Sequence, residues 1–145
     1  MQPLNTPFEA IRCPHHQEVY LSKMDTNLKL NDGYTIPMLA YGTGTAHIRS
    51  KMARGTHGQD VLDRDCVEQI KLAIRAGYRH LDNAEMYGTE REAGVAIVEC
   101  IEDGTIASRE ELFITSKTEK GALQAAKSLD QSLARLGPAV EYVDL

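Results

Sequence analysis

The sequence of 145 residues has no tryptophan, only two phenylalanines and no long run of apolar side chains. A helix that crosses a membrane needs about 18 or more consecutive apolar residues, so we expect no membrane-spanning segment and no membrane partner. Positive charge is also limited, because 16 lysines and arginines are outnumbered by 21 aspartates and glutamates, which gives a formal net charge of −5. This balance argues against a nucleic-acid-binding protein, whose contact surface is usually basic.

Cysteine is scarce as well, and Cys13, Cys66 and Cys100 lie far apart and are odd in number. The chain has no N-x-S/T glycosylation sequon, and its N-terminus lacks the basic stretch and apolar core of a signal peptide. These absences favour a cytoplasmic protein over a secreted, disulfide-bonded one. Cys66 and Cys100 fall on the apolar faces of predicted helices, where free cysteines usually pack in the core. Cys13 lies close to His15 and His16, but no second ligand pair follows at zinc-site spacing, so we expect no metal site.

The chain is predicted to begin with a flexible extension and a hairpin. Residues 1–27 form the extension, because they are polar, contain three prolines and show no sustained hydrophobic period. Asn31-Asp32-Gly33 then stands between two short alternating runs, residues 28–30 and 34–36. This pattern predicts a β-hairpin.

Beyond the hairpin, short apolar runs alternate with amphipathic helical patterns. Strands are predicted at residues 38–41, 78–82, 112–115 and 142–145, and helices at 66–74, 89–101 and 122–136. Asp63 or Asp65 can cap the first helix, and Thr89 with Glu92 forms a capping box for the second. The alternation predicts an α/β protein with a parallel sheet and right-handed crossovers. It leaves two architectures open, a doubly wound sheet or part of a (β/α)8 barrel.

In both architectures the functional residues lie in the loops after the carboxyl ends of the strands. These positions hold Gly42-Thr43, then Asp82 with Tyr87 five residues later, then Lys117. Adjacent strands lie only about 4.8 Å apart, so Asp82 and Lys117 can form an ion pair that Tyr87 can reach. A neighbouring positive charge favours a phenolate, which suits a tyrosine that acts as a general acid toward a carbonyl oxygen. The same spacing also fits a structural ion pair beside a surface tyrosine.

Residues 77–90, with the sequence Gly-Tyr-Arg-His-Leu-Asp-Asn-Ala-Glu-Met-Tyr-Gly-Thr-Glu, strongly resemble the signature of the aldo-keto reductase family. Residues 31–44 are similar to the opening hairpin and first barrel strand of that family, and residues 112–117 and 142–145 to its third and fourth strands. The resemblance runs in order from about Leu28 to the last residue. It implies that residues 28–145 form the first half of a (β/α)8 TIM barrel preceded by a β-hairpin.

The resemblance also implies roles for the residues after the strands. Tyr87 corresponds to the proton donor, Lys117 to the lysine that makes that phenol more acidic, and Asp82 to their charged partner. Gly42, Thr43 and Asp82 correspond to residues beside the nicotinamide end of bound NADP(H). The implied reaction reduces a small-molecule aldehyde or ketone to an alcohol by hydride transfer from NADPH. The sequence has no G-x-G-x-x-G after a strand and no P-loop, in agreement with a barrel that binds its cofactor extended across the strand ends.

Two segments near the predicted site depart from the family pattern. Gly44 and His47 occupy a region where the family often has tryptophan, so an aromatic wall of the substrate pocket is expected to be missing or replaced by an imidazole. Residues 46–59 carry five basic side chains and no acid. We expect them to form a long, solvated and mobile loop, although such a loop could also guide an acidic substrate or a cofactor phosphate.

The number of strands is a third departure, because a complete barrel takes about 250 residues and eight strands. We therefore expect the N-terminal fragment of a longer reductase, inactive on its own. The inward side of its strands is predicted to carry Leu39, Tyr41, Phe113 and Val143. A different hypothesis is a non-catalytic protein that self-associates or binds a partner protein through its exposed half-core and open sheet edge.

Overall fold

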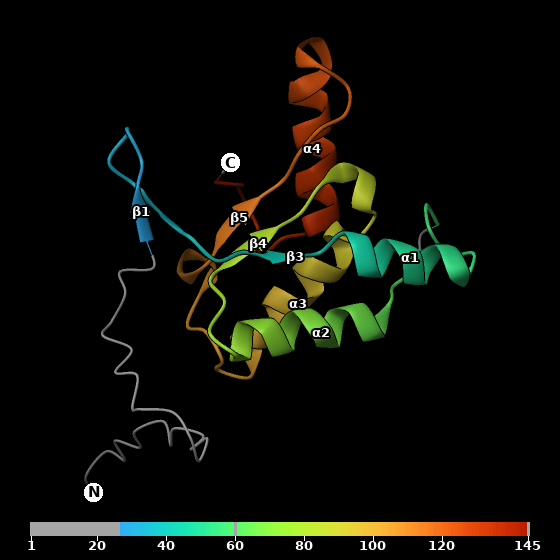
Figure 1. Cartoon of the computed structure of the whole chain (residues 1–145), viewed down its shortest axis with the longest axis horizontal. Helices are drawn as coiled ribbons and strands as arrows, with labels where there is room; N and C mark the ends of the chain where they lie inside the picture. The colour runs from blue at the N-terminus through green and yellow to red at the C-terminus, as the bar shows by residue number, and fades with distance from the viewer. Residues whose placement is uncertain (1–26, 60, 145) are drawn as a thin grey trace, which may run out of the picture.

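The computed structural model describes residues 27–59 and 61–144 (Figure 1). The predictions made for residues 1–26, including those for Cys13, His15 and His16, therefore lie outside the described residues. The described elements are, in chain order, β1 (Asn27–Lys29), β2 (Thr35–Pro37), β3 (Tyr41–Gly42), α1 (Thr45–Ala53), α2 (Arg64–Arg75), β4 (His80–Asp82), the 3-10 turn η1 (Glu85–Tyr87), α3 (Glu90–Glu102), η2 (Arg109–Glu111), β5 (Phe113–Thr115), η3 (Ala122–Gln124) and α4 (Ala125–Leu136).

The predicted hairpin is confirmed. β1 pairs antiparallel with β2, and Gly33 in the connecting turn has a φ of 96°, in the left-handed region that favours glycine. The Asp32 carboxylate accepts a hydrogen bond from the backbone N–H of Tyr34 over 3.0 Å. In Figure 1 the hairpin stands apart from the helices, at the left of the molecule.

The central sheet is parallel, in the order β3-β4-β5. Its register places Gly42 beside Asp82 and Asp82 beside Thr115, so the three strands end at one edge. α2 and α3 pack together on one side of this sheet (Figure 1), and Leu81 and Ile114 are fully buried in the core that they share with those helices. The alternation of strands and helices predicted from the sequence is therefore confirmed for these elements.

Four apolar side chains were expected on the inward side of the strands, which is the side away from the helices. This expectation is wrong for Tyr41 and Val143. Phe113 lies with His80 on the side away from the helices, where their ring centroids are 5.0 Å apart. Tyr41 and Val143 instead pack against the core on the helix side. Successive side chains of a strand point to opposite faces, so a difference of one residue in register reverses the face. Leu39 precedes β3 and is exposed.

The strand predicted at residues 142–145 does not form in the described part of the chain. A backbone hydrogen bond of 2.7 Å joins the N–H of Asp144 to the carbonyl of Ile114. The carboxylate of Asp144 then accepts from the N–H of Ile114 over 2.8 Å and from Arg109 over 2.7 Å. A side chain thus takes the place of the next backbone partner, and the segment runs beside β5 without a ladder.

The helix caps agree only in part with the sequence. The Asp63 carboxylate accepts from the N–H of Cys66 over 3.3 Å and caps α2, as predicted. The capping box predicted for α3 is wrong, because the hydroxyl of Thr89 donates to the carbonyl of Thr43 over 3.1 Å and makes no cap bond. The carboxylate of Glu92 is likewise engaged elsewhere.

The long mobile loop expected at residues 46–59 is also wrong, because its first part is helix α1. The segment has no proline or glycine before Gly55, so nothing interrupts helical hydrogen bonding over these residues. Its buried side consists of His47 and Lys51, four residues apart and therefore on the same face of the helix. An apolar period, the usual sign of a packed helix, is absent from this segment.

α4 forms where the sequence predicts a helix, but its predicted apolar stripe is largely exposed. Its buried residues are Ser128, Ser132 and Leu136, whereas Leu129 is exposed. α4 packs against α3 through one end and otherwise projects away from the sheet, as Figure 1 shows.

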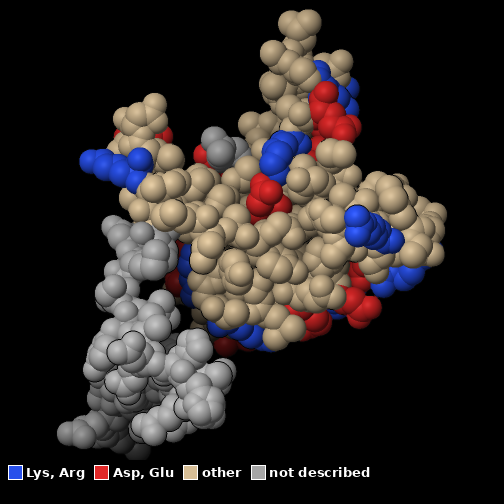
Figure 2. All heavy atoms as spheres, viewed as in Figure 1, with Lys and Arg blue, Asp and Glu red and all other residues tan. Residues whose placement is uncertain are grey.

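Ion pairs join the outer sides of α2 and α3. Glu99 accepts from Arg64 and from Lys71, each over 2.6 Å. These hydrogen bonds, first that of Arg64, lower the pKa of Glu99 to about 2. Figure 2 shows basic and acidic side chains interspersed over the visible face, with no large area of one sign.

No helix in the described parts of the chain is both long enough and apolar enough to span a membrane.

Candidate functional site

Asp82, Tyr87 and Lys117 lie together at the carboxyl edge of the sheet, and we call them the Asp–Tyr–Lys cluster. The Lys117 Nζ atom is 2.5 Å from Asp82 Oδ1 and 3.4 Å from the Tyr87 hydroxyl oxygen. It also donates to the backbone carbonyl of Asn83 over 2.8 Å and lies 4.9 Å from the centre of the Tyr87 ring. All three side chains retain access to solvent.

The sheet brings these residues together through backbone bonds as well as strand register. Asp82 ends β4 and Lys117 follows β5 by two residues, so both stand at the same edge. The N–H of Asn83 donates to the carbonyl of Thr115, and the N–H of Glu85 to that of Lys117, each over 2.9 Å. The η1 turn that carries Tyr87 is thus tied to the end of β5. This arrangement agrees with the proximity predicted from the sequence.

Gly42 and Thr43 have different surroundings, although both were predicted to lie beside a cofactor. Gly42 is exposed next to Asp82, and a Cβ atom added there would meet no atom of residues 27–59 or 61–144 within 4 Å. Thr43 is fully buried, its hydroxyl donates to the Asn83 side chain over 2.9 Å, and its Oγ1 atom lies 3.1 Å from Oγ1 of Thr89. Its N–H donates to the carbonyl of Asp82 over 3.0 Å. Thr43 therefore stabilises the strand ends through buried hydrogen bonds, while Gly42 leaves open space on their exposed side.

Asn83 is a structural residue of the site that the sequence reasoning missed. Its side chain is completely buried and its amide nitrogen donates to the carbonyl of Thr115 over 3.3 Å, in addition to the bond from Thr43. The available signal in the sequence was a polar residue directly after the strand that ends at Asp82.

Gly44 adjoins the cluster, whereas His47 does not. A Cβ atom added at Gly44 would lie 3.1 Å from Cε2 and from Cζ of the Tyr87 ring, so the glycine allows that ring to pack closely. His47 is buried, and its Nε2 atom lies 3.1 Å from the Tyr41 hydroxyl. Burial is the main cause that lowers the pKa of His47. The imidazole therefore faces Tyr41 and not the Asp–Tyr–Lys cluster.

The basic side chains of residues 46–59 are partly committed to internal ion pairs. Lys51 is buried against Glu92, with 2.7 Å between Nζ and Oε1. Arg54 pairs with Asp63 and lies 3.5 Å from Asp65. These two cations are thus already paired and are not free to attract an anionic substrate or a cofactor phosphate.

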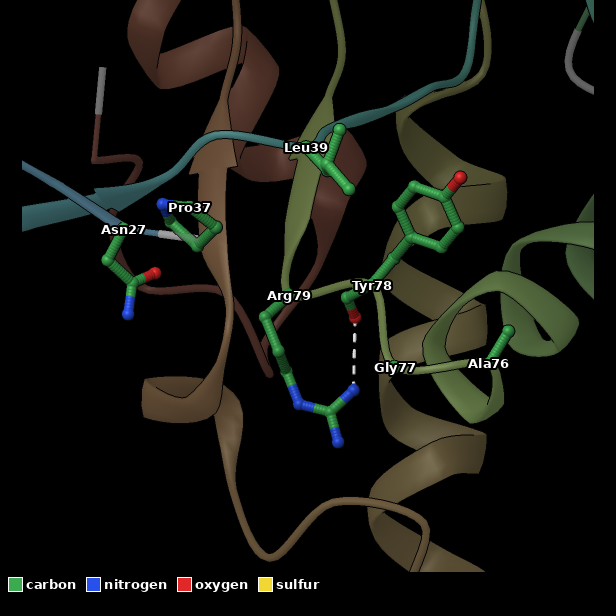
Figure 3. Close-up of a pocket in the computed structure, with 7 residues that line it drawn as sticks. All are labelled: Asn27, Pro37, Leu39, Ala76, Gly77, Tyr78 and Arg79. Atoms are coloured by element: carbon green, nitrogen blue, oxygen red, sulfur yellow. Dashed lines mark hydrogen bonds between the residues drawn. The ribbon is translucent and has the colours of Figure 1, made fainter. Parts of the chain in front are cut away.

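A cavity of about 410 Å³ lies at the other end of the strands, and Figure 3 shows the residues that line it. Its lining residues are Asn27, Pro37, Leu39, Ala76, Gly77, Tyr78 and Arg79. Figure 3 shows the Arg79 guanidinium bonded to the backbone carbonyl of Tyr78, over 3.0 Å. Tyr78 and Arg79 precede β4, while Asp82 ends it, so this cavity is separate from the Asp–Tyr–Lys cluster.

The parallel strands, the crossover helices and the polar cluster at the strand ends together define part of a (β/α)8 barrel with its site at the carboxyl edge. Residues 39–145 match the model of the Aldo/keto reductase family. The chain belongs to the aldo/keto reductase family.

Relatives and solved structures agree with this assignment. Aldo-keto reductase AKR2E4 of Bombyx mori is 40% identical over 121 residues, which are 81% of this chain and 35% of that protein. Estradiol 17 beta-dehydrogenase 5 of Mus musculus is 39% identical over 127 residues, 86% of this chain and 34% of the relative. The crystal structure of the Bombyx mori AKR2E4 in complex with NADP superimposes with a TM-score of 0.63 at 38% identity, covering 81% of this chain and 35% of that one. The chain spans about a third of the length of these relatives.

Proposed function

We propose that this protein provides the proton-donating part of an NADPH-dependent carbonyl reductase, with Tyr87 as the proton donor. The observation that carries the proposal is the position of the Lys117 ammonium, 2.5 Å from Asp82 and 3.4 Å from the Tyr87 hydroxyl. The substrate is a small aldehyde or ketone, and the product is the corresponding alcohol.

In the proposed reaction Tyr87 gives its hydroxyl proton to the carbonyl oxygen of the substrate. The carbonyl π bond breaks as the carbon accepts a hydride, and the oxygen takes the proton to complete the alcohol. The phenolate left on Tyr87 is stabilised by the ammonium of Lys117. Asp82 holds that ammonium in place and balances its charge.

The residues at the strand ends fit the nicotinamide end of NADP(H). Gly42 has no side chain and leaves open space beside Asp82, so these two residues would adjoin the nicotinamide end of a bound cofactor. When bound there, NADPH would supply the hydride that the carbonyl carbon accepts. The internal bonds of Thr43 favour a supporting role for this residue over direct contact with the cofactor. Two structural relatives, AKR2E4 of Bombyx mori and AKR2E5, were crystallised with NADP and NADPH, respectively.

We also infer that catalysis requires strands beyond those described. Residues 27–144 contribute three paired parallel strands, whereas a barrel closes with eight. We therefore expect residues 1–145 to be inactive when expressed alone, and the test uses a full eight-stranded barrel in which residues 28–145 supply the first strands. We call this protein the complete barrel.

The test compares Tyr87→Phe with Tyr34→Phe in the complete barrel. Tyr34 lies exposed in the hairpin turn and serves as the matched control. General acid catalysis contributes roughly 10² to 10⁴-fold, so Tyr87→Phe should lower kcat by about that factor while NADPH binding stays within about threefold. Tyr34→Phe should leave both unchanged. A Tyr87→Phe protein that keeps more than about a third of the activity, with chemistry limiting the rate, would contradict the proposal.

A further inference from the structure

Helix α1 holds the turn that carries Tyr87. We propose that Lys51 of α1 is a positioning residue that fixes Tyr87 within reach of Lys117, an inference that rests on the proposed function of Tyr87. The residue acts through the backbone of Gly88, directly after Tyr87, and does not touch the substrate.

The first observation is a buried bond network around Lys51. Its side chain is 3% exposed, and its ammonium lies 2.7 Å from Glu92 Oε1, whose side chain is 1% exposed. The same ammonium donates to the backbone carbonyl of Gly88 over 2.5 Å. Glu92 Oε1 accepts in addition from the N–H of Asp63 over 3.0 Å. Lys51 therefore connects α1, the start of α3 and the end of the η1 turn through one atom.

The main effect of this network is to fix the position of the Gly88 carbonyl, and its contribution to the stability of the fold is secondary. Removing a lysine and a carboxylate from water is costly, and a well-packed apolar pair of the same volume often stabilises a fold equally well. Among the described residues, Glu92 Oε2 is buried without a hydrogen-bond partner, so the pair is not fully compensated. An apolar pair, however, could not hold the Gly88 carbonyl. Fixing that carbonyl is the property that only the charged pair provides.

The second observation is that other parts of the same segment contact the same turn. Gly44, directly before α1, packs against the ring of Tyr87, since an added Cβ would lie 3.1 Å from Cε2 and Cζ. His57, after α1, lies near Gly88, with Nε2 at 3.7 Å from the Cβ that a side chain there would have. The turn is thus held by contacts before, within and after α1.

The tolerance of the cluster for movement is small. The distance of 3.4 Å from Lys117 Nζ to the Tyr87 hydroxyl is already at the long end for a hydrogen bond. A shift of the turn by a few tenths of an ångström away from β5 would end this contact. Misplacement of a catalytic group by about 1 Å can reduce the rate by roughly 10²-fold.

The chain offers a matched control in Lys71. Its side chain is 11% exposed and its ammonium lies 2.6 Å from Glu99, which belongs to α3, as Glu92 does. Lys71→Met and Lys51→Met therefore each remove a lysine that pairs with a glutamate of α3, although Glu99 is 25% exposed and Glu92 only 1%. Among the described residues, the Lys71 ammonium donates to Glu68 and Glu99 and not to the η1 turn.

The experiment uses the complete barrel with Lys51→Met, Lys51→Arg and Lys71→Met. We expect Lys51→Met to lower kcat at least tenfold while the Kd for NADPH stays within about threefold. Lys51→Arg should restore kcat to within about threefold of wild type, because a guanidinium can pair with Glu92 and still donate to the Gly88 carbonyl. Lys71→Met should leave kcat within about twofold, whatever its effect on stability. Equal losses of kcat in Lys51→Met and Lys71→Met would overturn the proposal.

A spectroscopic measurement separates this inference from the proposed function. The protein is labelled with 3-fluorotyrosine, and the ¹⁹F resonance that disappears in Tyr87→Phe is assigned to residue 87. Lys51→Met should shift or broaden that resonance, whereas Lys71→Met should not. This readout does not depend on activity, so it holds even if Tyr87→Phe shows that Tyr87 is not the proton donor. An unchanged resonance in folded Lys51→Met protein would refute the positioning role.

If Lys51→Met does not fold, Gly44→Ala tests whether the α1 segment positions Tyr87. It changes no charge, and its methyl group would press directly on Tyr87. A moved ¹⁹F resonance and a kcat lowered severalfold would support the positioning of Tyr87 by the α1 segment. An unchanged resonance and unchanged kcat would overturn it.

Discussion

Replacing Gly94 in α3 by alanine should destabilise the protein, although alanine is the better helix former. Gly94 lies where α3 meets the end of α4. A Cβ atom added there would lie 1.8 Å from the carbonyl oxygen of Leu136 and 2.6 Å from its carbonyl carbon. Non-bonded heavy atoms pack best at about 3.5 to 4 Å. Both obstructing atoms belong to the backbone, so no side chain can rotate away, and the two helices must separate.

Two opposing effects set the size of the change. Alanine in place of glycine gains about 1 kcal/mol within a helix. Overpacking costs about 1 to 3 kcal/mol, and a clash with backbone lies at the upper end of that range. The net loss in the free energy of unfolding should therefore be about 2 kcal/mol. Separation of the helices would also disturb the buried Glu90 carboxylate, which lies 2.5 Å from Arg135 of α4.

Urea denaturation of the complete barrel measures this change through the midpoint at constant m-value. Glu102→Ala, an exposed substitution near the end of the same helix, is the control and should stay within about 0.5 kcal/mol of wild type. A Gly94→Ala protein as stable as wild type, or more stable, would refute the close approach of α3 and α4 at this point.

Three further outcomes are expected. The pKa of Glu99 is lowered to about 2 from an ordinary 4.5, so its ion pairs should stabilise the fold fully above pH 4.5 and lose that effect as pH falls toward 2. The urea midpoint of wild type should therefore fall more steeply over this range than that of Glu99→Gln. Parallel curves would contradict the pairing. Burial raises the pKa of the Cys66 thiol to about 12, so iodoacetamide at pH 8 should label Cys66 only after denaturation. Rapid labelling of Cys66 in the folded protein would show that this thiol is accessible. Residues 1–145 expressed alone should self-associate in light scattering, because Leu123 and Leu129 are exposed and the three-stranded sheet has open edges within the described residues. A monodisperse monomer that melts cooperatively would show that this stretch is self-sufficient.

The sequence predicts the Asp–Tyr–Lys cluster because its geometry depends on few assumptions. Parallel strands end at one edge, and Asp82 and Lys117 each follow closely on an apolar run, so their proximity does not require exact strand boundaries. The signature around residues 77–90 adds the roles. Gly44 could be placed near the site in the same way, as a residue just after the first strand.

The parts that the sequence does not predict depend on side chains in unusual roles. α1 buries His47 and Lys51 in place of apolar residues, so its period resembles that of a solvated loop. Thr89 and Glu92 match a capping box by spacing, but tertiary partners, Thr43 and Lys51, compete successfully for both side chains. Such competition between a local and a distant partner cannot be read from one segment of the sequence.

The inward and outward faces of the strands show a different limit. Each of β3, β4 and β5 spans at most three residues, too few for an alternating pattern to define a face. The apolar character of Tyr41 gives no indication of side, and only its register with Leu81 determines it.

The central claim is that Tyr87 and Lys117 act as one proton-donating unit and not as a tyrosine beside a structural ion pair. A double-mutant cycle on the single-turnover rate of NADPH oxidation tests this most directly. It compares Tyr87→Phe, Lys117→Met and the double variant in the complete barrel, with NADPH bound beforehand. If the two residues act as a unit, the second substitution has little left to remove, and the double variant should be within about twofold of Tyr87→Phe alone. Losses that multiply across the two single variants would contradict the account.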